Sequence, residues 1–382
     1  MSVYLHHIET LVPEFAYDQS YARDIVASWV TDPKLQRVIK RIYNMSGIEK
    51  RHSVLGDFMP GAEPTLFLPG PAGRPIEPGT EERNRCFIEA SRRLSVDCAR
   101  RALAATPWVK ASCITHVITV SCTGFYNPGP DFDIVTQLGL SDRVERYNLG
   151  FMGCYAAFPA LRMARQFCIA DPEAVVLVVS IELCSLHLQV REDLDSMLAN
   201  TLFSDGVAAA IVSATPPDRL AFAMNSFATS LAVEGRRDMA WEIGNSGFNM
   251  ILSSYVPDII AANIRAVVEA AISDAGITYS DIGCWAVHPG GKAILDKIES
   301  ELGLDPKFLK ASREVLRDYG NMSSATVLFV LRRLLDDRTL PDGTSVLAMA
   351  FGPGLTIETA MMELTAAGSE ARISDPGAKN LA

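Results

Sequence analysis

Cys154 is the residue whose type and surroundings are best suited to nucleophilic chemistry. It lies in the stretch Arg146–Arg165, between a turn-rich segment containing Gly150 and Gly153 and an apolar run with helical periodicity. A cysteine just before a helix faces backbone N–H groups that have no partner within the helix, and these lower the pKa of a thiol. This stretch by itself fits a reactive thiolate and a buried structural cysteine equally well.

A histidine and an asparagine occupy comparable positions further along the chain. His288 ends an apolar strand pattern and enters the turn Pro289-Gly290-Gly291, and Asn321 precedes an apolar helix pattern. Each has a structural explanation by itself, since a loop histidine is often structural and asparagine is a frequent helix N-cap. Cysteine, histidine and asparagine at three strand-to-helix turns of one α/β chain are better explained as a catalytic set.

Papain-like proteases use the same three residue types in the same order. His288 follows Cys154 by roughly 130 residues, which is also the separation in those enzymes. They carry the cysteine near the mature N-terminus in a Cys-Gly-[Ser/Ala]-Cys-[Trp/Tyr] context, and this sequence has neither feature. Spacing alone therefore does not identify the chemistry.

Two similar series of strands and helices would position these turns. The first is predicted as a strand at 3–12, helices at 17–46 (interrupted near Asp32-Pro33) and 81–105, a strand at 116–121, a helix at 131–138, the helix after Cys154, a strand at 174–180, a helix at 194–202 and a strand at 206–213. The second is predicted as a helix at 257–275, a strand at 284–288, helices at 290–302 and 323–336, and a strand at 345–350.

Two local features refine this prediction. The β-branched run at 174–180 is typical of a strand buried on both faces of a mainly parallel sheet. Pro159 would be costly deep in a helix, so the helix after Cys154 should begin near 157–158 or kink there.

The simplest account is an α/β protein of two similar halves. The N-terminal half, 1–213, carries the cysteine, and the C-terminal half, 214–366, carries the histidine and the asparagine. Residues 367–382 are small and polar with Pro and Gly, and we expect a flexible tail there.

Composition and charge argue against several classes of function. The 382 residues are 48% hydrophobic and 21% charged, and no apolar run resembles a membrane span or a signal peptide. The eight cysteines are dispersed without paired spacing, which predicts reduced thiols, no metal site and a cytoplasmic location. The net charge of −10 argues against nucleic-acid binding. A basic cluster opposes that charge and indicates either an anion site or a solvated helix face: Lys34, Arg37, Lys40, Arg41, Lys50 and Arg51.

Together these motifs resemble those of the type III polyketide synthases, the chalcone synthase-like branch of the thiolase-fold condensing enzymes. The resemblance covers nearly the whole chain, up to residue 363. It rests on Gly153-Cys154 before an Arg-containing helix, Leu202-Phe-Ser-Asp-Gly206, Trp285-Ala-Val-His-Pro-Gly-Gly291, Tyr319-Gly-Asn-Met-Ser-Ser-Ala325 and Phe351-Gly-Pro-Gly354. Ala350 stands where the family loop Gly-Phe-Gly-Pro-Gly has its first glycine, and Phe125-Tyr126-Asn127 departs from the plant pattern.

The resemblance implies a five-layered αβαβα thiolase-like fold and a homodimer. It assigns Cys154 as the acyl-carrying nucleophile, with His288 and Asn321 as its partners. The substrates would be an acyl-CoA starter and malonyl-CoA, joined by decarboxylative Claisen condensation without a metal or redox cofactor and released as a pyrone, a resorcinol or a related product.

Further residues receive roles from the same resemblance. Phe203 would stand at the pocket mouth, Arg41 and Lys40 would bind the phosphates of coenzyme A, and the residues that shape the pocket would be His187, Trp241, Met250 and Ser323. The context of His187 and Trp241 is closer to bacterial enzymes that extend fatty acyl starters.

The chemistry of the three residue types agrees with these roles. A thiolate accepts an acyl group from a thioester and gives it back, and a nearby imidazolium keeps a thiol ionised. A histidine N–H and an asparagine amide can hold the enolate oxygen that malonyl decarboxylation creates.

The sequence is compatible with two alternative functions. A ketoacyl-carrier-protein synthase also uses cysteine, histidine and asparagine, but its usual His-Gln-Ala-Asn motif is replaced here by His-Pro-Gly-Gly, although a carrier protein could still replace coenzyme A. A non-catalytic partner paralogue typically loses the nucleophile, whereas all three residues are intact here.

Overall fold

The computed structural model describes residues 1–366, so the predicted flexible tail at 367–382 lies outside the described residues. The first half of the chain contains the predicted elements in the predicted order, and in addition three strands that were not predicted. Its elements are β1 (Tyr4–Leu11), β2 (Phe15–Asp18), α1 (Gln19–Ser28), α2 (Pro33–Met45), β3 (Lys50–Ser53), α3 (Thr80–Ala105), β4 (His116–Ser121), α4 (Pro130–Leu138), β5 (Glu145–Gly150), α5 (Ala157–Ala170), β6 (Val175–Leu183), α6 (Leu194–Leu202) and β7 (Asp205–Ser213). The strands that were not predicted are β2, β3 and β5.

The second half contains more strands than the sequence pattern indicates. Its elements are β8 (Ala221–Leu231), β9 (Met239–Gly244), β10 (Gly247–Leu252), α7 (Val256–Ala275), β11 (Ile282–Val287), α8 (Lys292–Leu302), α9 (Lys310–Tyr319), α10 (Thr326–Asp336), β12 (Ser345–Gly352) and β13 (Thr356–Thr365). Of these, β8, β9, β10, α9 and β13 were not predicted.

Two proline positions follow the predicted pattern. Asp32 accepts a hydrogen bond from the backbone N–H of Lys34 at 2.8 Å and caps α2, whose first residue is Pro33. α5 begins at Ala157, so Pro159 lies in the first turn, where its missing N–H removes no helical hydrogen bond. Pro33 therefore begins its helix and Pro159 lies within a first turn, so neither proline breaks a helix.

The sheet is mixed, which corrects the prediction of a mainly parallel sheet. Nine strands are hydrogen-bonded in the order β11-β12-β13-β8-β1-β7-β6-β4-β5. The pairs β11–β12, β4–β5 and β4–β6 are parallel, and the other five are antiparallel. β6 is fully buried, as predicted. Burial on both faces makes a strand uniformly apolar whichever way its neighbours run, so this pattern does not report strand direction.

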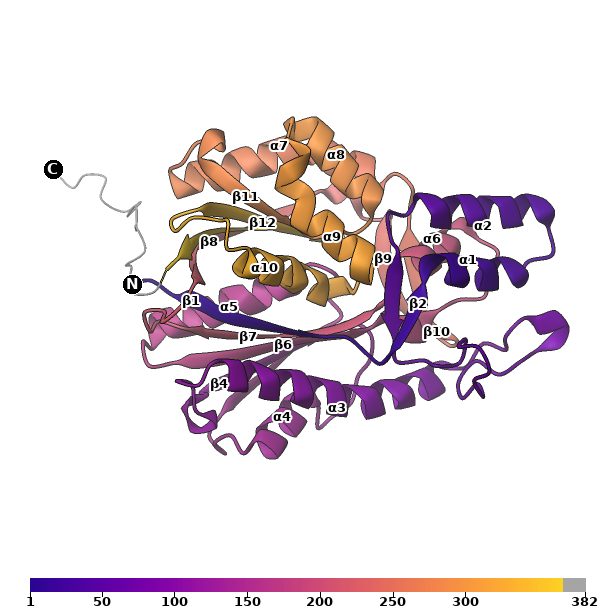
Figure 1. Cartoon of the computed structure of the whole chain (residues 1–382), viewed down its shortest axis with the longest axis horizontal. Coiled ribbons are helices and arrows are strands. Elements are labelled where there is room, and N and C mark those ends of the chain that lie inside the picture. Colours follow the sequence, from indigo (N-terminus) through magenta and orange to yellow (C-terminus); the bar gives the residue numbers. More distant parts are fainter. Residues whose placement is uncertain (367–382) are drawn as a thin grey trace.

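The elements form five layers, as predicted. Figure 1 shows α7 and α8 on one outer face, then β11, β12 and β8, then α5 and α10 in the middle. Below these lie β1, β7 and β6, followed by α3 and α4. β1 and β8 pair at only two positions, and they join the strands of the two halves. α5 and α10 contact strands of both halves, so they form the shared central layer.

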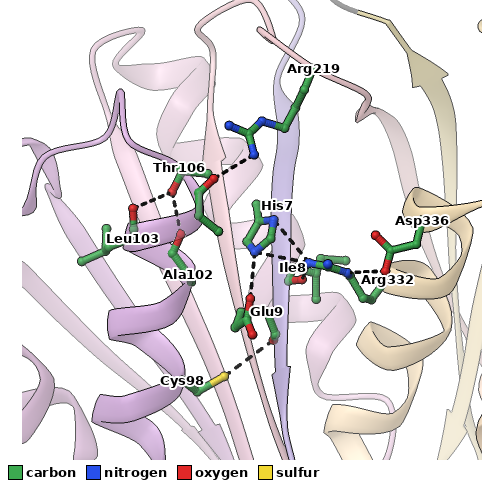
Figure 2. A network of polar contacts seen from close by, with 11 residues as sticks. His7, Ile8, Glu9, Cys98, Ala102, Leu103, Thr106, Arg219, Arg332 and Asp336 are labelled. Carbon is green, nitrogen blue, oxygen red and sulfur yellow. Dashed lines mark hydrogen bonds and ion pairs between the residues drawn. The ribbon is translucent and has the colours of Figure 1, made fainter.

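A polar network attaches α10 of the second half to β1 of the first (Figure 2). Arg332 donates to the backbone oxygen of Ile8 at 2.6 Å and to Asp336 at 2.7 Å. The ring of His7 lies 3.3 Å from the same guanidinium and bonds Glu9 at 3.1 Å. α10 follows directly after the Asn321 segment, so the network helps to fix that segment relative to the half that carries Cys154.

Candidate active site

One cavity brings together the side chains of Cys154, His288 and Asn321. Its empty space is about 1450 Å³, including the mouth that opens to solvent. Cys154 comes from the turn before α5, His288 directly follows β11, and Asn321 follows α9. Three turns that are far apart in the sequence therefore meet where the two halves join.

The second half of the chain braces the turn that holds Cys154. Gly153 has a φ of +87°, a conformation that side chains disfavour, and a Cβ added there would lie 2.4 Å from Pro353. A Cβ at Gly352 would lie 2.4 Å from the ring of Tyr155. The segment Phe351–Gly354 thus packs directly on the turn, and glycine is needed on both sides of the contact.

The electrostatics of Cys154 differ from the prediction. Burial raises the pKa of the thiol to about 12, although contacts with Ser323 and Asn321 oppose this shift. The side chain is half-buried by surface area because it faces the cavity, and the cavity itself lies deep in the protein. The effect of helix N–H groups falls off beyond the first turn, and α5 begins only at Ala157. The thiol by itself is therefore neutral at neutral pH.

His288 is buried without a structural task for its side chain. Its backbone N–H donates to Met349 at 2.8 Å, but both ring nitrogens are enclosed and bond no atom of residues 1–366. Burial lowers the pKa of the imidazole to about 3, so the ring is neutral at neutral pH. The surroundings of the two groups therefore do not by themselves favour the expected thiolate–imidazolium pair. A buried ring with no hydrogen-bond partner suggests a functional role.

The amide of Asn321 has a defined orientation. Its Oδ1 accepts from the backbone N–H of Ser323 at 2.9 Å, and its Nδ2 donates to the carbonyl oxygen of Gly290 at 3.2 Å. An amide flip would place like groups together at both contacts, so the assignment is unambiguous. Because Nδ2 carries two hydrogens, one of them remains available as a donor.

Two pocket residues predicted from the sequence hold the segment that follows β4. His187 Nδ1 accepts from the backbone N–H of Phe248 at 3.1 Å, so its Nε2 carries the proton and donates to the Thr123 carbonyl at 2.7 Å. Trp241 Nε1 donates to the Cys122 carbonyl at 2.7 Å. Both side chains also line the cavity. His187 is neutral, since burial lowers its pKa to about 3.

The other three predicted pocket residues line the same cavity. Phe203 forms a β-bridge with Asn321 where α6 ends. Met250 pairs with Trp241 in the small β9–β10 sheet. Ser323 is buried and its hydroxyl lies 3.2 Å from Cys122 Sγ.

Arg41 and Lys40 are not part of the cavity wall. Both side chains are exposed on α2, whereas Tyr43 of the same helix lines the cavity. The structure thus places the two cations outside the cavity, on a helix that contributes to its wall.

Glu182, a completely buried carboxyl beside the site, was not predicted from the sequence. It accepts hydrogen bonds from the backbone N–H of Cys122 and from the Thr123 hydroxyl, both at 3.0 Å, and from the hydroxyl of Ser324. Cys122 Sγ lies 3.3 Å from the same carboxyl and 3.2 Å from Ser323. Burial raises the pKa of Glu182 to about 6. A glutamate within the apolar run of β6 was the available signal.

Residues 1–366 contain neither a cluster of metal ligands nor a membrane-spanning helix. No group of three or more metal-ligating side chains is close enough to hold a metal ion. No helix of this part of the chain is long and apolar enough to cross a membrane.

Comparison with known proteins identifies the family. The N-terminal domain of chalcone and stilbene synthases matches residues 6–216, and the C-terminal domain matches residues 221–365. A Mycobacterium tuberculosis protein described as alpha-pyrone synthesis polyketide synthase-like Pks18 is 32% identical over 364 residues, which cover 94% of this chain and 90% of the relative.

Solved structures agree with this match. The bacterial type III enzyme 1,3,6,8-tetrahydroxynaphthalene synthase from Streptomyces coelicolor superposes with a TM-score of 0.85 at 30% identity, covering 95% of this chain and all of that one. PKS-I from the brown alga Ectocarpus siliculosus gives a TM-score of 0.88 at 28% identity, covering 95% and 99%. The chain therefore belongs to the chalcone and stilbene synthase family and is a type III polyketide synthase.

Proposed function

We propose that the enzyme loads an acyl group from acyl-CoA onto Cys154, extends it with malonyl-CoA and releases it by ring closure. The observation that carries this proposal is the cavity that holds a thiol, a histidine ring without a partner and an amide with a free N–H. The described function of the Pks18 relative, alpha-pyrone synthesis, supports a lactone among the products.

Starter loading would transfer a proton between two groups that are both neutral at rest. Burial disfavours a separate thiolate and a separate imidazolium, so the Cys154 proton moves to His288 as the sulfur attacks the thioester carbonyl. The bond to the new sulfur forms and the bond to the coenzyme A sulfur breaks. The departing thiolate then takes the proton from His288.

Extension would use the free donors of the site. Malonyl-CoA loses carbon dioxide, and the electron pair of the broken bond becomes an enolate. The second N–H of Asn321 and an N–H of His288 stabilise its oxygen. The enolate carbon attacks the acyl group on Cys154, whose thiolate leaves.

Loading and extension involve no electron transfer, so we propose that no cofactor is needed beyond the thioester substrates. Dialysis against a chelator tests this proposal, and the enzyme should keep its full activity.

The starter is proposed to be a fatty acyl group. An apolar part of the cavity wall is built from α1, α6 and the loop after β3, with Ile25, Val26, Trp29, Leu55 and Phe58 among its members. Such a wall suits methylene groups, each of which contributes about 0.8 kcal/mol on burial.

Replacing Ala199 by phenylalanine should shorten the accepted starter. Ala199 lies on α6 and lines the cavity, so the larger ring would occupy space for the chain. Displacing four methylenes corresponds to about 3 kcal/mol, or a loss of ~10²-fold in kcat/KM for palmitoyl-CoA. Acetyl-CoA should be affected far less. Labelled malonyl-CoA with a panel of acyl-CoA starters, read by mass spectrometry, measures both.

The same panel tests the proposed function itself. Ala104→Phe on the exposed side of α3 is the matched control and should keep the wild-type preference. Equal use of long and short starters by the wild type and Ala199→Phe would contradict the fatty acyl assignment. No labelled product from any starter would contradict the synthase chemistry. Offering the same starters on a carrier protein decides whether a carrier replaces coenzyme A.

Arg41→Ala should raise KM for both thioesters more than it lowers kcat. We propose that Arg41, together with Lys40, contacts the coenzyme A phosphates outside the cavity, far from the reacting carbons. Such a contact binds ground and transition states alike. An exposed ion pair of about 0.4–1 kcal/mol corresponds to a two- to fivefold rise in KM. Arg101→Ala on the exposed face of α3 is the control, and an unchanged KM in Arg41→Ala would return this residue to a solvated surface role.

We also propose a boundary between the two halves of the chain, a homodimer and a cytoplasmic location. The boundary between the halves at 213/214 is supported by the segment between β7 and β8, where Thr215 and Pro216 are exposed; limited proteolysis should cut there. A homodimer is proposed from the family, and sedimentation at micromolar concentration measures it. A cytoplasmic location is proposed because all eight cysteines are free, and cell fractionation tests it.

A further inference from the structure

A second buried carboxyl, Asp205, is connected to the cavity by two serine hydroxyls. Asp205 begins β7 and is completely buried. It accepts hydrogen bonds from the backbone N–H groups of Val54 at 2.8 Å and Ser185 at 2.7 Å, and from the Ser185 hydroxyl at 2.6 Å. The Ser185 oxygen lies 2.7 Å from the hydroxyl of Ser53. Both serines line the cavity that contains Cys154.

The direction of these hydrogen bonds follows from proton counting. A serine hydroxyl has one proton, and that of Ser185 is donated to Asp205. The bond between the serines must therefore be donated by Ser53. The Ser53 oxygen also accepts from the backbone N–H of Leu55 at 2.9 Å, which leaves it one lone pair. The chain Ser53–Ser185–Asp205 is thus oriented to pass a proton from the cavity to the carboxyl.

Asp205 also differs from a buried carboxyl that is neutralised by an ion pair. Glu358 on β13 is paired with Arg162, whereas the guanidinium whose charge acts on Asp205, Arg51, donates its bonds to Gln19 and to backbone oxygens of Asn200 and Phe203. Burial raises the pKa of Asp205 to about 6, so at neutral pH it is ionised but close to accepting a proton. Arg51 is the charged group that acts on this carboxyl, and the Asp205 charge in turn raises the pKa values of its titratable neighbours Tyr17 and Cys184.

We propose that Asp205, acting through Ser185 and Ser53, is the base for ring closure through oxygen. An enol hydroxyl of the polyketide on Cys154 attacks the thioester carbonyl, forming the C–O bond of a lactone and breaking the C–S bond. The enol proton passes to Ser53 while the proton of Ser53 moves to Ser185 and that of Ser185 moves to Asp205. The released Cys154 thiolate takes a proton from solvent, and Asp205 returns the relayed proton to solvent, so both groups regain their starting states. This inference rests on the proposed function and names the release step at the same site.

Ser185→Ala and Ser53→Ala test the relay. In a single turnover of preloaded enzyme, each should slow lactone formation by about 10²-fold, the lower range for general base catalysis, so that the open-chain acid from hydrolysis accumulates. Ser185→Thr keeps the hydroxyl and should restore the lactone. Thr229→Ala removes a hydroxyl from Glu358, a buried carboxyl outside the cavity, and serves as the matched control.

The pH profile separates this role from a structural one. The base is the ionised form of Asp205, which is present above its pKa of about 6, so the wild-type lactone fraction should fall as the pH drops from about 7 to 5. Ser185→Ala should show no such step. If both serine variants keep the wild-type lactone fraction and pH step, or if loading, extension and closure all fall together, the relay is overturned. A wild type that extends starters but forms no lactone also overturns it, whereas a wild type that makes no polyketide contradicts the proposed function instead.

Discussion

Cys154→Ala is expected to abolish condensation while leaving malonyl-CoA decarboxylation measurable. The alanine cannot carry an acyl group, so product formation should fall by about 10⁴-fold or more, as when the nucleophile of a catalytic set is removed. The donors at the enolate oxygen stay in place, because His288 and Asn321 are held by the second half of the chain. Release of labelled carbon dioxide and intact-protein mass spectrometry measure the two steps separately.

A matched cysteine controls for folding in this experiment. Cys168 lies on α5 in the core and does not line the cavity, so Cys168→Ala should load starter like the wild type. Cys154→Ser tests the nucleophile without changing the size of the side chain greatly. Normal acyl-enzyme formation and turnover in Cys154→Ser or Cys154→Ala would exclude Cys154 as the acyl carrier.

The fold could be predicted where burial leaves a local pattern. α3, β4 and α6 were predicted to within one or two residues because each has an apolar face or run that the core requires. β5 was missed because it is an edge strand whose residues are exposed or partly buried, so it has no such pattern. The predominance of antiparallel pairs was also missed, since pairing depends on which distant strands meet.

The active site, too, could be predicted only in part from the sequence. Cys154, His288 and Asn321 could be proposed because each lies in a short motif at a turn, and the structure brings them into one cavity. The charges could not be inferred from position, since the neutral thiol and imidazole result from burial by residues of both halves. The serine link to Asp205 was equally hidden, because Ser53 and Ser185 are distant in sequence and meet only in the fold.

Asn321→Ala is expected to separate decarboxylation from loading. Its free N–H is assigned to the enolate oxygen, so its loss should lower malonyl-CoA decarboxylation by about 10²–10³-fold, the effect of removing one oxyanion donor. Starter loading should remain largely intact, because the Cys154 proton goes to His288. His288→Ala should impair both steps. Rapid-quench measurement of acyl-enzyme, beside carbon dioxide release, distinguishes the two patterns.

A second substitution at this position separates donation from packing. Asn321 Oδ1 also accepts from the backbone N–H of Ser323 at 2.9 Å, so alanine removes a structural contact along with the donor. Asn321→Asp keeps an acceptor for Ser323 and loses the Nδ2 donors, and it should be as defective in decarboxylation as Asn321→Ala. Near-normal decarboxylation in Asn321→Asp would reduce the role of Asn321 to holding Ser323. Failure of Asn321→Ala to load starter would instead mean that the amide acts on the thiol rather than on the enolate.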